Sequence, residues 1–152
     1  MHVVLVNPLI PQNTGNISRL CAGTDSDLHL VGELGFSLED RYLRRAGLDY
    51  WPSVKLHRHA SFEALVRELA PERMAFFSSH ATRPYTAFEP GADPWFVFGT
   101  ETTGLPADLR DAYIDHLYKI PITANVRSLN LANSVAIVLY DALRQRGFPG
   151  LG

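Results

Sequence analysis

Short apolar runs alternate with helical patterns along the whole chain. The runs are mostly continuous rather than alternately apolar and polar, which is typical of strands that are covered on both faces. Six of them predict strands: His2 to Val6, Leu28 to Val31, Val54 to His57, Met74 to Ser78, Trp95 to Phe98 and Leu117 to Ile120. Because helical segments separate these runs, the pattern predicts an α/β fold, a mostly parallel sheet with helices on both faces.

The clearest helix lies near the end of the chain. Leu129 through Arg146 is rich in Leu, Ala and Val and stops before Gly147, a residue type that commonly ends helices. Four apolar positions fall on one face of this helix and should be buried: Leu131, Val135, Val138 and Leu139. A second helix is indicated after Ser61, whose hydroxyl suits a helix start.

The composition suits one globular domain over residues 1–152, because 46% of the residues are hydrophobic and no long linker divides the chain. Cys21 is the one cysteine, so no intrachain disulfide can form, and we expect a cytoplasmic protein. Cys21 lies in an apolar stretch and is expected in the core rather than as a nucleophile. No apolar run approaches the roughly 20 residues that span a bilayer, so we expect no membrane association.

Three polar segments adjoin predicted strand ends, where open α/β sheets usually bind ligands. The first covers residues 7–19 and contains two prolines before a helix that Asn13 or Thr14 would open. The free N–H groups of a helix start can hold an anion. Arg19, about one turn further on, could supply a fixed cation to the same space. The alternative is an ordinary capped helix start with a surface arginine.

The second segment covers residues 98–106, in which Gly99 ends an aromatic strand and Gly104 precedes a helix. Glycine permits a positive φ angle and lets a ligand approach the backbone closely. Glu101 would lie at the carboxyl edge of the sheet, where it could accept hydrogen bonds from hydroxyls or pair with Arg19. The alternative is a plain connection between a strand and a helix.

The third segment covers residues 120–134 and places Ser128, Asn130 and Asn133 at the start of an otherwise apolar helix. Ser128 could simply be the N-cap. The two asparagines are poor helix formers, and their placement favours contact with a ligand or with the first segment.

Together the three segments resemble the three motifs of the SPOUT methyltransferases, most closely the TrmL subfamily, which methylates the 2′-hydroxyl of the tRNA wobble nucleotide. A further block, Leu43 to Tyr50, looks characteristic of that subfamily. Asn7 is a departure, since many relatives have an acidic residue before the proline. The matching blocks are Asn13 to Cys21, Phe98 to Glu101 with Gly104 to Pro106, and Arg127 to Leu131.

The resemblance implies a SPOUT α/β knot with a deep C-terminal trefoil, which periodicity could not indicate because true knots are so rare. It also implies a homodimer that takes S-adenosyl-L-methionine (SAM) as methyl donor, releases S-adenosylhomocysteine and uses no metal. The implied acceptor is the ribose of C34 or U34 in the anticodon stem-loop of tRNA, with leucine isoacceptors expected.

Carried over residue by residue, the resemblance implies a SAM pocket formed by Phe77, Gly99, Ile120, Ser128 and Leu129. The reacting ribose would be met by Arg19, with Asn13, Ser128 and Asn130 fixing the arrangement and Glu101 holding the arginine. A guanidinium is effectively always protonated in proteins. We therefore expect Arg19 to orient the 2′-hydroxyl and its phosphate rather than to act as a literal base.

RNA binding requires a local basic patch, because the net charge is only −2 and the pI about 6.3. Arg41, Arg44 and Arg45 are spaced to fall on one side of a helix and could bind phosphates. The alternative is a solvated charged face. Tyr50 and Trp51 either pack in the core or stack on an extruded base.

Three rival interpretations follow. His57 and His59 would share one strand face, but no acidic or cysteine partner stands near them in the sequence, so no metal site is expected. The second alternative is that this protein is a SPOUT enzyme that methylates a ribose elsewhere, in rRNA or at another tRNA position. A non-catalytic RNA-binding module is the third, and the joint retention of Arg19, Glu101 and Asn130 speaks against it. Patterns typical of α/β-hydrolases, NTPases and Rossmann oxidoreductases do not occur.

Overall fold

The computed structural model describes residues 1–39, 41, 43 and 50–152. Six strands form one sheet in the order β3-β2-β1-β5-β4-β6, and every pairing between them is parallel. The α/β class and the parallel sheet predicted from the apolar runs are thus confirmed. The strands are β1 (His2–Val6), β2 (Asp27–Val31), β3 (Lys55–His59), β4 (Arg73–Phe77), β5 (Pro94–Phe98) and β6 (Leu117–Tyr118).

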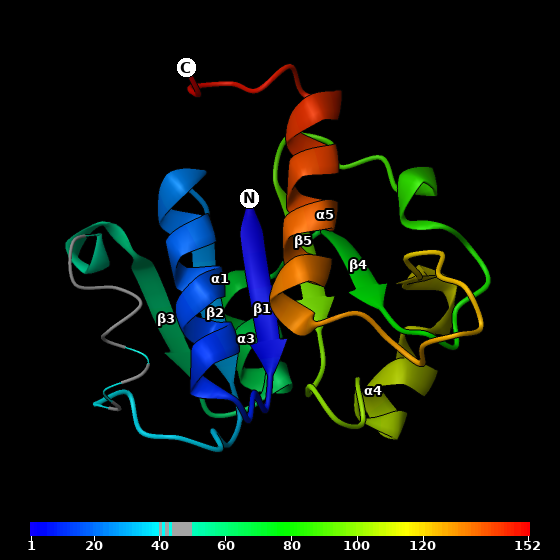
Figure 1. Ribbon diagram of the computed structural model, residues 1–152, viewed down its shortest axis with the longest axis horizontal. Coiled ribbons are helices and arrows are strands. Elements are labelled where there is room, and N and C mark those ends of the chain that lie inside the picture. The colour runs from blue at the N-terminus through cyan, green and yellow to red at the C-terminus, as the bar shows by residue number, and fades with distance from the viewer. Residues whose placement is uncertain (40, 42, 44–49) are drawn as a thin grey trace.

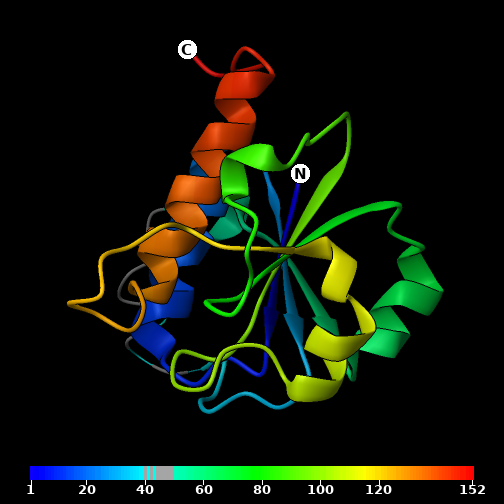
Figure 2. The ribbon, with the colours of Figure 1, turned by 90° about the vertical axis from the view of Figure 1, so that its right-hand side faces the viewer.

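Helices cover both faces of the sheet. α1 and α5 lie on one face, and α3 and α4 lie on the other (Figures 1 and 2). The helices are α1 (Pro11–Gly23), α3 (Phe62–Leu69), α4 (Ala107–Ala112) and α5 (Leu131–Gln145), with short 3-10 turns η1 (Trp51–Ser53), η2 (Tyr85–Ala87) and η3 (Ile114–His116). Within the ranges just given, no helix is long and apolar enough to cross a membrane.

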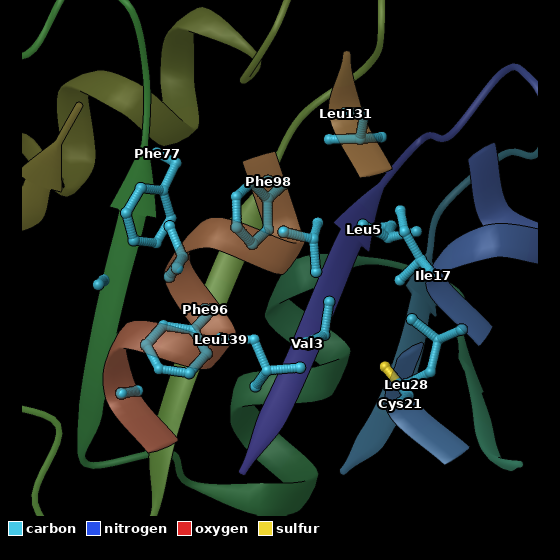
Figure 3. Close-up of a cluster of buried hydrophobic side chains, with 14 of the residues drawn as sticks. Val3, Leu5, Ile17, Cys21, Leu28, Phe77, Phe96, Phe98, Leu131 and Leu139 are labelled. Atoms are coloured by element: carbon cyan, nitrogen blue, oxygen red, sulfur yellow. The ribbon is translucent and has the colours of Figure 1, made fainter. Parts of the chain in front are cut away.

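Two apolar clusters, one on each face, hold these layers together. The cluster under α1 and α5 contains strand residues such as Val3 and Phe96 together with Leu139 of α5 (Figure 3). The face of α5 predicted from its spacing is buried as expected. Cys21 is also buried there, beside Leu28, so its predicted place in the core is confirmed.

Two strand ends differ from the prediction by two residues, and five others differ by one. β6 stops at Tyr118 rather than Ile120, because the backbone of Lys119 bonds with the segment at Arg83 and Tyr85 instead of with the sheet. β3 runs on to His59, two residues further than predicted. β3 is an edge strand, and polar residues are common in edge strands. The apolar run in the sequence therefore ends before the pairing with β2 does.

The expectation that His57 and His59 have no acidic partner is wrong. His57 Nε2 lies 2.9 Å from the Oδ2 atom of Asp27, and His59 Nδ1 lies 3.4 Å from the Oε2 atom of Glu68. Asp27 is on the neighbouring strand, and Glu68 is on α3 next to it in space. Sequence distance therefore hid both carboxylates.

Candidate functional site

The loops that follow β1 and β5 meet at the carboxyl edge of the sheet, where the chain order reverses between these adjacent strands. Glu101, just after β5, joins them. Its Oε2 accepts a hydrogen bond from the backbone N–H of Leu9 (2.8 Å), and its Oε1 accepts one from Ile10 (3.0 Å). Asn13 Nδ2 lies at 3.5 Å from the same Oε1. A single carboxylate thus fixes the first loop against the second.

The start of α1 differs from the prediction that Asn13 or Thr14 opens it. The helix begins at Pro11, and Ile10 is its N-cap without a side-chain hydrogen bond. Proline suits a first helical position because the missing N–H would be unpaired there anyway. The carboxylate of Glu101 lies just ahead of this helix start, where it accepts hydrogen bonds from the N–H groups of Leu9 and Ile10.

The third loop is tied to the first by two asparagines. Asn130 Nδ2 donates to Asn13 Oδ1 at 3.0 Å, and Asn13 is buried. Asn130 Oδ1 accepts from the N–H groups of Ala132 (2.9 Å) and Asn133 (3.3 Å). Asn130 is therefore the N-cap of α5, and the suggestion that Ser128 fills this position is wrong. The predicted contact between this asparagine and the first segment is confirmed.

A cavity of about 520 Å³ lies beside this network, a volume typical of ligand pockets. The ends of β4, β5 and β6 and the loop before α5 enclose it, and Phe77 and Phe98 stack at its base with ring centroids 4.8 Å apart. Glu101 lies on its wall. All five residues expected at the SAM pocket line it: Phe77, Gly99, Ile120, Ser128 and Leu129.

Three cations line the same cavity and were not selected from the sequence: Arg110, Lys119 and Arg127. Arg127 stands inside the third motif, so its neighbours could have pointed to it. Arg110 of α4 and Lys119 after β6 carry no motif signal, because only the fold brings their elements to the cavity.

The tight path of the second loop explains its glycines. A Cβ atom on Gly99 would lie 2.0 Å from the carbonyl carbon of Gly104, so no larger residue fits. Gly104 has a φ angle of +72° and exchanges backbone hydrogen bonds with Thr100. The close approach expected at Gly99 is thus made by the chain's own backbone.

Arg19 lies apart from this network. Among the residues that the structure describes, it neither pairs with Glu101 nor lines the cavity, so the expected ion pair between them is wrong. Because α1 begins at Pro11, Arg19 stands about 12 Å along the helix axis from its start. It is exposed, and its guanidinium lies over the ring of Tyr50, 5.5 Å from the centroid.

The predicted RNA-binding arginines are only partly covered. Arg41 is exposed, whereas Arg44 and Arg45 lie outside the described residues. Tyr50 is half-buried, and its hydroxyl donates to the backbone carbonyl of Gly15 at 3.1 Å. Its ring thus lies against α1, under the guanidinium of Arg19, and belongs to neither apolar cluster.

Comparison with known proteins gives a consistent result. Residues 1–140 match the SpoU rRNA Methylase family. A tRNA (cytidine(34)-2'-O)-methyltransferase of Methylovorus glucosotrophus is 48% identical over 97% of this chain and 97% of its own length. One from an Acidovorax species is 47% identical over 97% of this chain and 93% of its own length.

Solved structures extend this similarity to the fold. A structure on the 2-OH methylation of C/U34 on tRNA has a TM-score of 0.91 at 39% identity, covering 96% of this chain and 95% of that one. The SpoU methyltransferase AviRb of Streptomyces viridochromogenes, in complex with the cofactor AdoMet, has a TM-score of 0.82 at 25% identity, covering 96% and 60%. With a family match over nearly the whole chain and full-length relatives of this similarity, the chain belongs to the SpoU rRNA methylase family.

Proposed function

We propose that this chain transfers a methyl group from SAM to the 2′-hydroxyl of nucleotide 34 of tRNA. The observation that carries the proposal is the cavity lined by all five expected cofactor residues, directly beside the bonded network of Glu101, Asn13 and Asn130. The relatives named for this reaction, 47 and 48% identical over nearly full length, support the same activity.

SAM fits the residues that line the cavity, and its sulfonium supplies the methyl group. The apolar wall at Phe77 and Leu129 suits an adenine ring, and the backbone at Gly99 and Ile120 offers donors and acceptors to it. A cation such as Arg127 suits the carboxylate of the methionine part. AviRb, which resembles this chain in fold, was solved with AdoMet bound.

The protein's own contribution is positioning, because methyl transfer needs the ribose oxygen in line with the sulfonium. Asn130 ties the third loop to the first, and Ser128 lies on the cavity wall in front of it. Arg19 holds the 2′-hydroxyl and the adjacent phosphate as a fixed cation. Proton removal by Arg19 would require a strongly perturbed guanidinium, so its role is orientation.

A homodimer would bring Arg19 to the reaction. Arg19 lies outside the cavity of its own chain, so an arginine from a second copy has to complete the site. An apolar surface suited to such pairing is offered by Ile137 and Tyr140 on α5, whose side chains are 36% and 47% exposed.

The acceptor is the anticodon stem-loop, with leucine isoacceptors as substrates, in the cytoplasm. The relatives named tRNA (cytidine(34)-2'-O)-methyltransferase support an acceptor at this position of tRNA. The basic patch proposed at Arg44, Arg45 and the exposed Arg41 would hold phosphates of the stem. Its contribution to the affinity for tRNA should weaken as salt is raised.

The test is to incubate the protein with methyl-labelled SAM and, in separate reactions, with unmodified leucine tRNAs or with rRNA, and to digest the products to nucleosides. We expect label in 2′-O-methylcytidine or 2′-O-methyluridine, mapped to the wobble position. Label on a base would overturn the proposal, and label on a ribose of rRNA with none on tRNA would support the rival ribose methyltransferase instead.

A further inference from the structure

A group of histidines on the neighbouring strands β1, β2 and β3 plays no part in the site described above. His2 of β1, His29 of β2 and His59 of β3 lie on the sheet face that α3 covers, and His29 is 1% exposed. The cavity lies at the carboxyl ends of β4, β5 and β6, and none of these three histidines lines it. A ligand held by these histidines would therefore be independent of the proposed methyl transfer.

These rings form a continuous chain between two carboxylates. His2 Nε2 lies 2.9 Å from Asp93 Oδ1, and His2 Nδ1 lies 3.0 Å from His29 Nε2. His29 Nδ1 then lies 3.0 Å from His59 Nε2, and His59 Nδ1 lies 3.4 Å from Glu68 Oε2. Every ring nitrogen of the three histidines thus faces another polar atom of the chain.

The proton count of this chain leaves one contact empty. A neutral imidazole carries one N–H, and a carboxylate only accepts, so three neutral histidines bring three protons to four contacts. Within the part of the chain that the structure describes, His59 Nδ1 is buried without a hydrogen bond. The row of three histidines therefore has one contact without a proton. Either a further proton or a cation can fill it.

We propose that a divalent ion of the Zn²⁺ type binds between His2 Nδ1, His29 Nε2 and a carboxylate oxygen of Asp27. The three ligand atoms lie within 4.8 Å of one another. Two imidazole nitrogens on a tetrahedral zinc ion are about 3.4 Å apart, so the present 3.0 Å has to widen only slightly. Two imidazoles and one carboxylate favour zinc, nickel or copper over magnesium or calcium.

Each proposed ligand is already held from behind, as metal ligands usually are. Asp93 accepts from His2 on the side away from the ion, His59 faces the far nitrogen of His29, and His57 Nε2 lies 2.9 Å from Asp27 Oδ2. The ring of His2 also stacks on Trp95, with centroids 3.8 Å apart. The ligands therefore have little freedom to lose on binding.

An ion at this position fills the contact that lacks a proton, so that all four contacts of the three histidines are satisfied. His29 then donates from Nδ1 to His59 Nε2, and His59 donates from Nδ1 to Glu68, so all three imidazoles are neutral and every contact carries one proton or the ion. The expected tautomers follow from the contacts and can be checked directly.

The test titrates ZnCl₂ into chelator-treated full-length protein by calorimetry. We expect one ion per chain, a rise in Tm of about 5 °C or more at a hundredfold excess over Kd, and no effect of MgCl₂. Long-range ¹H–¹⁵N spectra should show His59 protonated at Nδ1 only after ZnCl₂ is added. Methyl transfer should not change.

Variants separate this site from chance binding. His2→Gln and Asp27→Asn, at partly exposed positions, should weaken ZnCl₂ binding at least tenfold, whereas the exposed His116→Gln should bind as the original protein does. His29→Gln is a poor first test because that side chain is buried. The proposal is overturned if the protein binds no ZnCl₂ or if His2→Gln leaves the binding unchanged. It is also overturned if the ¹H–¹⁵N spectra show that the three histidines carry a fourth proton in place of an ion.

Discussion

Asn130 Nδ2 donates to Asn13 Oδ1 across 3.0 Å, joining two residues 117 positions apart in the sequence. The same Asn130 caps α5 through its Oδ1 atom, so one side chain both starts the last helix and holds the first loop. Because Asn13 also reaches Glu101, all three loops of the site share this network.

Replacing Asn130 should separate its two roles. Asn130→Ala removes the N-cap and should lower the unfolding free energy by about 1 kcal/mol or more. Asn130→Asp keeps an acceptor for the cap but turns a carboxylate toward Asn13 Oδ1, so we expect a nearly unchanged Tm with turnover reduced at least tenfold. Thermal unfolding and single-turnover methyl transfer measure the two effects. Asn133→Ala, one turn away and exposed, is the control, and equal turnover in all three variants would contradict the account.

Gly99→Ala should damage the cavity. Its Cβ atom would lie 2.0 Å from Gly104, so the loop that carries Glu101 has to move. We expect the Kd for SAM, measured by calorimetry, to rise at least tenfold together with a fall in Tm. Gly23→Ala is the matched control, since nothing lies within 4 Å of its added Cβ atom. A Gly99→Ala protein that binds SAM normally would refute the tight path of this loop.

Much of the fold followed from the apolar runs, because strands buried on both faces leave little room for polar residues. The predicted end of the edge strand β3 was two residues too early. His59 belongs to the sheet, but it is polar and so does not continue the apolar run. The contact from Asn130 to the first loop was expected because an asparagine inside an apolar helix start needs a partner. The trefoil knot rests on the family resemblance and stays a prediction.

The site was harder to predict where geometry between elements decides it. The sequence suggested that Glu101 and Arg19 form an ion pair. α1 starts at Pro11, however, and this places Arg19 too far along the helix axis to reach Glu101. Residue type alone suggested that the start of α1 could hold an anion, and the carboxylate of Glu101 lies just ahead of it. Lys119 could not be found, because it reaches the cavity only through the pairing of β6 with β4.

Arg19→Ala should lower the turnover number by about two orders of magnitude without changing the Kd for SAM, because the role proposed for Arg19 is to hold the ribose and phosphate of the RNA and not the cofactor. Arg19→Lys should recover little, since a lysine lacks the fork of donors that holds a hydroxyl and a phosphate together. Single-turnover kinetics and calorimetry give the two quantities. Near-normal turnover of Arg19→Ala with intact SAM binding would contradict its role.

Cys21 should be chemically silent in the folded protein. Burial raises the pKa of its thiol to about 12, so only about one molecule in 10⁴ carries the reactive thiolate at pH 8. We expect the thiol reagent DTNB to react at the rate of unfolding and to react at once in denaturant. Rapid stoichiometric reaction of the native protein would show that Cys21 is accessible.

Ribose methylation at nucleotide 34 is tested most directly with two anticodon stem-loops of a leucine tRNA that differ in one atom. One carries the ordinary ribose at position 34, and the other carries 2′-deoxyribose there. With labelled SAM, we predict methyl transfer to the first and background label in the second, because the deoxy substrate lacks the accepting oxygen. Equal labelling of both would contradict the account, since the methyl group would then go elsewhere.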